Sequence, residues 1–199
     1  GLETKITSPE WLPDYGTAEF KPRMGATATG ARQILIAYNV NLNTSDKKKA
    51  NAIAGTIRTS GVILRDVDGE KLLSEDGKPI RKPGMFQHLQ AAGWMYNQDT
   101  AQVSMNLLNH NVTGLHSVTD AIRSEAEKIG LKAVAGELVG LVPLRAIISA
   151  GKHYHNEPDS ADYATLVQSA IDGLMLNELE EFDAHNSIIE WALESNLGD

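Results

Sequence analysis

The sequence contains no cysteine and fewer basic than acidic residues. The missing thiols exclude a disulfide framework, a thiolate nucleophile and a thiolate metal site, and they fit a reducing compartment. Acidic residues outnumber basic ones by 26 to 18, which gives a net charge of −8. Because binding to a phosphate backbone needs clustered lysine and arginine, we expect no nucleic-acid partner.

Long apolar runs are also absent from the sequence. No run approaches the roughly 18 to 20 residues that cross a bilayer, and no basic-then-apolar leader precedes the first predicted strand. We therefore expect a cytoplasmic protein without a membrane partner. With 199 residues, of which 42% are hydrophobic, the chain is long enough for one hydrophobic core.

Local patterns predict three parts along the chain. Three prolines in residues 1–31 rule out a continuous helix or central strand, so this part is a connector segment. Residues 32–144 form the core, and two Asp-Gly turn signals within residues 62–83 predict an inserted hairpin. Residues 145–199 form a C-terminal helical extension of two or three helices.

The core is predicted to be an α+β fold whose strands and helices follow the order βαββαβ, which is the order of a ferredoxin-like sandwich. The first helix is expected to have Thr44 or Ser45 as its N-cap, and the second to bury a stripe that includes Ile129. The two helices would cover one face of the sheet, whose central pair is formed by the strands at 32–42 and 102–109. The other face would be open.

That open face collects neutral hydrogen-bonding side chains from two strands. They are Asn39, Asn41 and Asn43 on the first strand and Gln102, Ser104 and Asn106 on the third. Asparagine is depleted in strands, so a row of amides is unusual there. It suits a planar, polar, uncharged group such as a pterin better than a phosphate. The alternative is a solvated face or a face packed on another subunit.

Two further features leave alternatives open. Glu137 lies in the apolar run AVAGELVGLV, where a carboxylate contacts a ligand, forms a salt bridge or lies at a sheet edge. The stretch GATATGAR has glycines at the Walker A interval, but Ala31 and Arg32 replace the lysine and hydroxyl residue of a P-loop. It is either a turn that approaches a ligand or a tight turn into the first strand.

The histidines do not form a readable catalytic or metal pattern. His153 and His155 share a face only on a strand, and the segment HYHNEPD is typical of a helix end, so we expect no metal. The other four histidines have no serine or cysteine partner readable from the sequence and are expected to be structural.

Several ordered blocks resemble the C-terminal half of the formiminotransferase family. They are GATATGARQILIAYNVNL (25–42), AQVSMNLLN (101–109), VTGLHSV (112–118) and ELVGLVPL (137–144), and PEWLPDYG (9–16) resembles the connector into that half. The resemblance covers nearly the whole chain, and its main departure is the inserted hairpin.

The resemblance implies a function and a set of partners. The family transfers a formimino group from N-formimino-L-glutamate to tetrahydrofolate in histidine degradation, with folate in a tunnel between two ferredoxin-like halves. Its catalytic acid/base histidine belongs to the N-terminal half, so this chain would be the folate-binding half of a glutamate formimidoyltransferase, inactive alone. The implied partners are the N-terminal half, both substrates, a second copy in a homodimer, and a fused or separate cyclodeaminase.

The resemblance and the polar face together nominate a folate site and no catalytic residue. The nominated residues are Trp11, Asp14, Gly25, Ala26, Thr27, Gly30, Asn39, Asn41, Gln102, Ser104, Asn106, Glu137, Leu138 and Gly140. The alternative function is a non-catalytic ferredoxin-like module that binds a small molecule or forms oligomers, since fold does not fix function.

Overall fold

The computed structural model describes residues 1–197 and divides the chain into two compact units, Gly1–Arg32 and Gln33–Asp199. The last two residues of the predicted helical extension lie outside the described residues. The first unit holds a short helix α1 (Leu2–Ile6) and a single 3-10 turn (Pro9–Trp11). The second unit holds the sheet and all the other helices.

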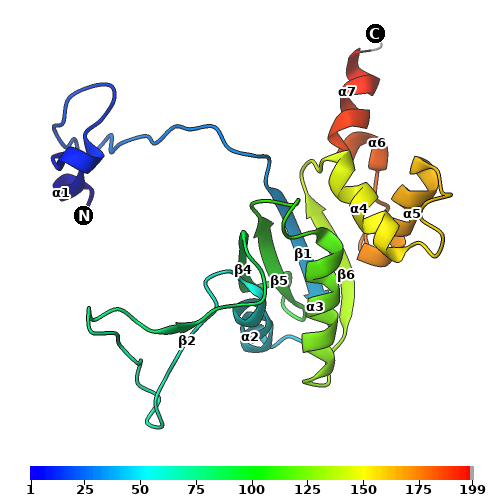
Figure 1. Ribbon diagram of the computed structural model, residues 1–199, viewed down its shortest axis with the longest axis horizontal. Helices are drawn as coiled ribbons and strands as arrows, with labels where there is room; N and C mark the ends of the chain where they lie inside the picture. The colour runs from blue at the N-terminus through cyan, green and yellow to red at the C-terminus, as the bar shows by residue number, and fades with distance from the viewer. Residues whose placement is uncertain (198–199) are drawn as a thin grey trace. The chain divides into compact units, whose positions relative to one another are not determined.

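A four-stranded sheet forms the centre of the second unit (Figure 1). Its strands are β1 (Ile36–Leu42), β4 (Leu89–Met95), β5 (Ala101–Leu107) and β6 (Ala133–Val139). The strand order is β4-β5-β1-β6, and every neighbouring pair is antiparallel. The fold is therefore α+β, and β1 and β5 are the adjacent central pair that the sequence predicts.

Strand β1 sends alternate side chains into the core. Its side chains at Ile36, Tyr38, Val40 and Leu42 are fully buried, and burying such a side chain contributes roughly 1.5–3 kcal/mol. The predicted strand began earlier, but Ile34 is 54% exposed and the strand starts at Ile36. Without a neighbouring strand to pair with, the residues before Ile36 stay outside the sheet.

Two helices pack on this apolar face, α2 (Lys47–Ile57) and α3 (Leu115–Glu127). The predicted N-cap at Thr44 or Ser45 is wrong, because the Asp46 side chain caps the helix by accepting a hydrogen bond from the Lys48 N–H at 2.8 Å. The hydroxyl of Thr44 instead accepts from the Asp46 N–H.

The buried stripe of α3 is one residue shorter than the sequence predicts. Leu115, Val118, Ile122 and Ala126 are buried, but Ile129 is 45% exposed. The helix ends at Glu127, so Ile129 lies beyond the helix and does not continue its buried stripe.

Four helices follow the sheet, rather than the two or three expected. They are α4 (Leu144–Tyr154), α5 (Tyr163–Leu174), α6 (Ala184–Ser187) and α7 (Ile189–Leu197). Buried side chains of α4 and α5 join the same hydrophobic core as the sheet. The Gly136 N–H of edge strand β6 donates to the carbonyl of Met175 at 2.9 Å, so the end of α5 covers part of that edge.

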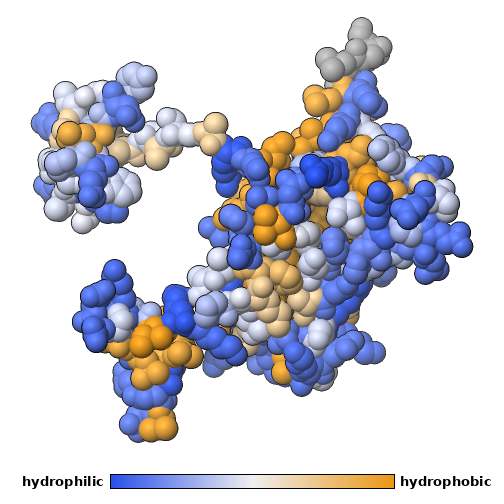
Figure 2. Space-filling model, in the orientation of Figure 1, coloured by the Kyte–Doolittle hydropathy of each residue, from blue (hydrophilic) through white to orange (hydrophobic). Residues whose placement is uncertain are grey.

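The segment after α2 forms a hairpin of two short antiparallel strands, β2 (Val62–Ile63) and β3 (Arg81–Lys82). Two isolated bridges extend the pairing toward its tip. Hydrophobic side chains gather on its surface in Figure 2. These exposed residues are Leu64, Val67, Leu72, Leu73 and Ile80.

No helix within residues 1–197 has the length and apolar character needed to cross a bilayer.

The close contact between β6 and α5 gives a test of this packing. A Cβ added at Gly136 would collide with the carbonyl oxygen of Leu174, so we expect Gly136→Ala to lower the unfolding free energy by about 1–3 kcal/mol. Urea unfolding followed by circular dichroism measures this change. Gly30→Ala, where no atom lies within 4 Å of the added carbon, is the matched control. Equal stability of the two variants would contradict the packing.

Candidate functional site

The sheet face opposite α2 and α3 carries the nominated amides in three aligned rows. In the first row, Asn39 pairs with Ser104 on β5 and with Glu137 on β6. In the second row, Asn41 pairs with Gln102 on β5 and with Ala135 on β6. Side chains opposite each other in a sheet share a face, so these groups lie together.

A third row extends this surface toward the far end of the sheet. There, Asn106 of β5 pairs with Gln90 of β4 and with Ala37 of β1. We call the surface formed by Asn39, Asn41, Gln102, Ser104, Asn106 and Glu137 the amide face.

The amide face is less open than the sequence predicts. Asn39, Asn41 and Gln102 are only 9%, 2% and 5% exposed. Because these side chains are shielded from water, any of their polar atoms that has no hydrogen-bond partner destabilises the fold. The expectation of an open face is therefore wrong for its central rows, where neighbouring side chains enclose the amides.

Glu137 has the partner that a carboxylate in an apolar strand needs. The Asn39 Nδ2 donates to Glu137 Oε2 at 2.8 Å. Strand β6 is also one of the two edge strands of the sheet. Glu137 therefore combines an edge position with a hydrogen bond inside the amide face, and the salt bridge weighed from the sequence is not formed among the described residues.

Two amides in the second row lack such a partner. The Oδ1 of Asn41 and the Oε1 of Gln102 are buried without a hydrogen bond among the described residues. An unsatisfied buried amide of this kind costs about 1–3 kcal/mol. The two residues are direct cross-strand neighbours, so the cost is concentrated at one point of the face.

Two hollows open on the amide face. One, of about 260 Å³, is lined by β4 and β5 and includes Gln90, Ser104 and Asn106. The other, of about 250 Å³, lies between Tyr96, Glu137 and the segment 179–183 that follows α5. Both are smaller than the roughly 300–1,000 Å³ of typical ligand pockets, so each resembles part of a site more than a complete one.

An aromatic ring borders the second row. Trp94 of β4 pairs with Gln102 and is 59% exposed. The Nζ of Lys47, the first residue of α2, lies 4.8 Å from the centre of its ring, a cation–π contact. The sequence reasoning missed Trp94, although its alternation with Ala92 along the predicted strand could have found it.

The other nominated residues lie in different surroundings. Leu138 packs against the hydrophobic core and also lines the hollow beside Glu137. Gly140 follows β6 with a φ of +81°, a conformation that favours glycine. The remaining six belong to the first unit and stay a prediction of the resemblance. They are Trp11, Asp14, Gly25, Ala26, Thr27 and Gly30.

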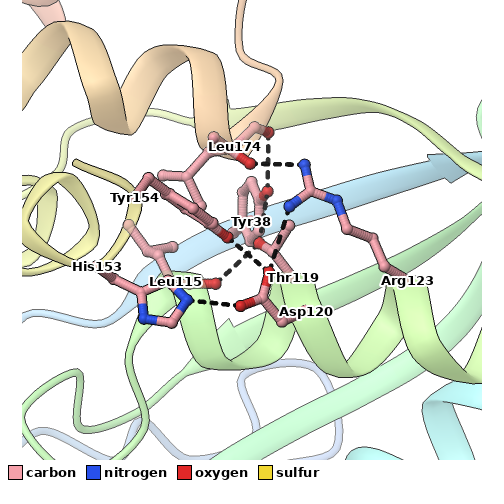
Figure 3. A network of polar contacts seen from close by, with 9 residues as sticks. Tyr38, Leu115, Thr119, Asp120, Arg123, His153, Tyr154 and Leu174 are labelled. Atoms are coloured by element: carbon pink, nitrogen blue, oxygen red, sulfur yellow. Dashed lines mark hydrogen bonds and ion pairs between the residues drawn. The ribbon is translucent and has the colours of Figure 1, made fainter. Parts of the chain in front are cut away.

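A second polar cluster, on the opposite side of the sheet, is centred on Asp120 of α3 (Figure 3). Its carboxylate lies 2.7 Å from His153 Nε2 and accepts hydrogen bonds from Tyr154 and Arg123 at 3.0 and 3.2 Å. Arg123 Nη2 also donates to the carbonyl of Gly173 at 2.7 Å. The cluster therefore links α3 to α4 and to the end of α5, and the sequence gives no signal for it.

His116 lies beside this cluster, with its ring stacked on that of His153 at 4.6 Å between centroids. Burial, and then the neighbouring His153, lower the pKa of His116 below its usual value. Its Nδ1 is buried without a hydrogen-bond partner among the described residues. Among those residues, no group of three side chains is arranged to hold a metal ion.

Comparison with known proteins assigns the family. The family model described as the formiminotransferase domain matches residues 37–194. The chain belongs to the formiminotransferase family. The match includes every residue of the amide face.

Full-length relatives are similar along almost all of this chain. The formimidoyltransferase-cyclodeaminases of Dictyostelium discoideum and Rattus norvegicus are each 36% identical over 99% and 96% of it. The glutamate formimidoyltransferase of Streptococcus pyogenes serotype M1 is 30% identical over 96%. The chain spans only 34%, 32% and 49% of these three proteins, respectively.

The lowered pKa of His116 predicts a loss of stability in acid. In the unfolded chain this histidine takes up a proton near its ordinary pKa of 6.5, whereas in the folded chain it does so only at lower pH. The unfolding free energy therefore falls as the pH drops below about 6.5. Urea unfolding at pH 7 and pH 5 measures the fall, which we expect to be smaller in His116→Gln. The same fall in both proteins would contradict the prediction.

Proposed function

We propose that this chain is the folate-binding half of a glutamate formimidoyltransferase, with the amide face as one wall of the folate site. The observation that carries the proposal is that neutral amide side chains lie together on one face of the sheet in a member of this family. Neutral donors and acceptors suit the flat, uncharged pterin ring. Tetrahydrofolate is then a co-substrate, and the proposal needs no metal.

The proposed fold of residues 32–144 is the ferredoxin-like sandwich, with the hairpin at 62–83 as an insertion. The strand order β4-β5-β1-β6 and the two helices on one face support this assignment. Residues 1–31 are proposed to be a connector, and residues 145–199 a helical extension.

The proposed reaction moves a one-carbon unit between two nitrogens. N5 of tetrahydrofolate attacks the formimino carbon, and the bond from that carbon to the glutamate nitrogen breaks. A general acid/base must carry a proton from the incoming nitrogen to the outgoing one. Within the amide face the only ionisable side chain is Glu137, which hydrogen-bonds Asn39, so we assign the proton transfer to a histidine of an N-terminal half and expect no turnover by this chain alone.

The remaining proposals concern the setting of the enzyme. The names of the relatives support a fused or separate cyclodeaminase partner. The chain covers only 34% and 49% of two of these relatives, which supports a separate N-terminal formiminotransferase half. We further propose a homodimer in the cytoplasm that acts in histidine degradation on N-formimino-L-glutamate. An oligomerisation module is the second candidate, favoured by the exposed apolar side chains of the hairpin.

Titration of the chain with 5-formyltetrahydrofolate tests the proposed site. We expect saturable binding, read by tryptophan fluorescence because Trp94 borders the amide face, and confirmed by calorimetry. The double variant Asn39→Ala with Asn106→Ala should bind at least tenfold more weakly while keeping its far-UV circular dichroism. Asn111→Ala, at an exposed asparagine, is the matched control. Unchanged affinity in the folded double variant would overturn the site.

Formiminoglutamate alone and light scattering separate the two candidate functions. The proposed binding half should give a folate signal that formiminoglutamate does not reproduce. An oligomerisation module should bind no folate, and substitution of the exposed Leu72 and Leu73 by lysine should lower its mass in solution.

A further inference from the structure

A cavity of about 770 Å³ lies at the outer edge of the sheet, where the end of α2 meets the start of β4 (Figure 1). Its lining consists of residues 58–60, which follow the helix, residues 87–91 at the start of the strand, and Leu108. The volume falls within the roughly 300–1,000 Å³ of typical ligand pockets. No residue of the amide face lines this cavity, so the proposed function leaves it unexplained.

The two chain segments that form most of this cavity carry positive charge only. Residues 47–65 contain five lysines and arginines and no acidic residue, and residues 77–98 contain three and none. The whole chain has a net charge of −8, so this region is basic within an acidic protein. A cleft lined by charges of one sign attracts ligands of the opposite sign.

Two arginines meet at the wall of the cavity. Arg58 Nε donates to the carbonyl of Gly61 at 2.9 Å, and Arg81 Nη1 lies 3.4 Å from the same oxygen. Arg81 Nη1 also donates to the carbonyl of Ser60 at 3.0 Å. Among the described residues, neither arginine forms an ion pair with a carboxylate. Arg58 is partly buried, and charges withdrawn from water are normally paired, so an anion is the partner that this pair lacks.

Unused hydrogen-bond donors lie at the same place. Arg58 donates through Nε and Nη1, the latter to the carbonyl of Ala91 at 3.4 Å, while its Nη2 enters no hydrogen bond of residues 1–197. Leu108 N–H donates to the carbonyl of His88, so the alternation of an antiparallel ladder turns the N–H of Ala91 away from β5, toward the outer edge. A carboxylate or phosphate oxygen accepts from such donors and offers none in return.

We propose that this cavity binds a small organic anion. Its carboxylate or phosphate group lies against Arg58 and Arg81, and its apolar part contacts Leu108 and the methyl group of Ala91, both in the lining. The site lies along the outer edge of β4, whereas the centre of the amide face is formed by β1 and β5. It is therefore a second ligand site, separate from the proposed folate wall.

NMR titration of the ¹⁵N-labelled chain tests the charge of the ligand. The probes are phenyl phosphate and benzoate, with benzamide as the neutral counterpart of benzoate. We expect saturable shifts of the amide signals of Ser60 and Ala91 with at least one of the two anions and none with benzamide, and the tighter anion identifies the preferred acidic group. Equal binding of benzamide, or no saturable shift with either anion, would contradict the inference.

A charge variant tests the assigned residues. Arg81 is exposed, so Arg81→Gln should keep the far-UV circular dichroism of the chain while binding the tighter anion about tenfold more weakly. Arg65→Gln is the matched control, because it removes the same charge from an exposed arginine that also donates to a backbone carbonyl, that of Gly69. Equal affinity of the two variants would refute the assignment.

A competition experiment separates this site from the folate site. We expect 5-formyltetrahydrofolate to leave the shifts caused by the anion unchanged. Displacement of the anion would make the cavity part of the folate site, which would overturn this inference and leave the proposed function standing. Absence of any saturable folate binding would overturn the proposed function, whereas the anion titration would still decide this inference.

Discussion

The pairing of β1 with strands on both sides is the constraint on which the rest of the structure depends. Because side chains alternate along a strand, its register with β5 and β6 sends Tyr38 and Val40 into the core and Asn39 and Asn41 to the opposite face. A slip of one residue would exchange the two sets and bury the amides among apolar side chains. Core and candidate site are therefore fixed by one register.

The core side of β1 also organises the C-terminal helices. The Tyr38 hydroxyl donates to the carbonyl of Leu174 at 3.1 Å and lies 3.0 Å from Thr119 Oγ1. Asp120 then holds α4 through His153 and Tyr154 (Figure 3). These contacts set the end of α5, from which the chain continues to the segment that lines the hollow beside Glu137.

The amide face has the features of an incomplete site. Its hollows are small, and two of its amides lack partners within the described residues. The chain also spans only about a third of its bifunctional relatives. In the proposed function, the small hollows and the short span have one common reason: the N-terminal half supplies the rest of the site.

The sequence by itself determined the strands, the two sheet-covering helices and the composition of the amide face. Alternation and helical spacing are local, so one chain segment is enough to reveal them. Local patterns failed at helix ends, where adjacent residues compete to cap or stop the helix: Asp46 caps α2 in place of Thr44 or Ser45, and Ile129 falls beyond the end of α3.

Only the tertiary structure decided which of the amides are satisfied. Periodicity places Asn39 and Asn41 on the same face, but it says nothing about what lies across the sheet. Pairing with β6 gives Asn39 the carboxylate of Glu137, whereas Asn41 lies opposite Ala135 and Gln102 and its oxygen stays unpaired. Hydrogen bonds between segments about a hundred residues apart depend on strand order and register, and no local pattern encodes either.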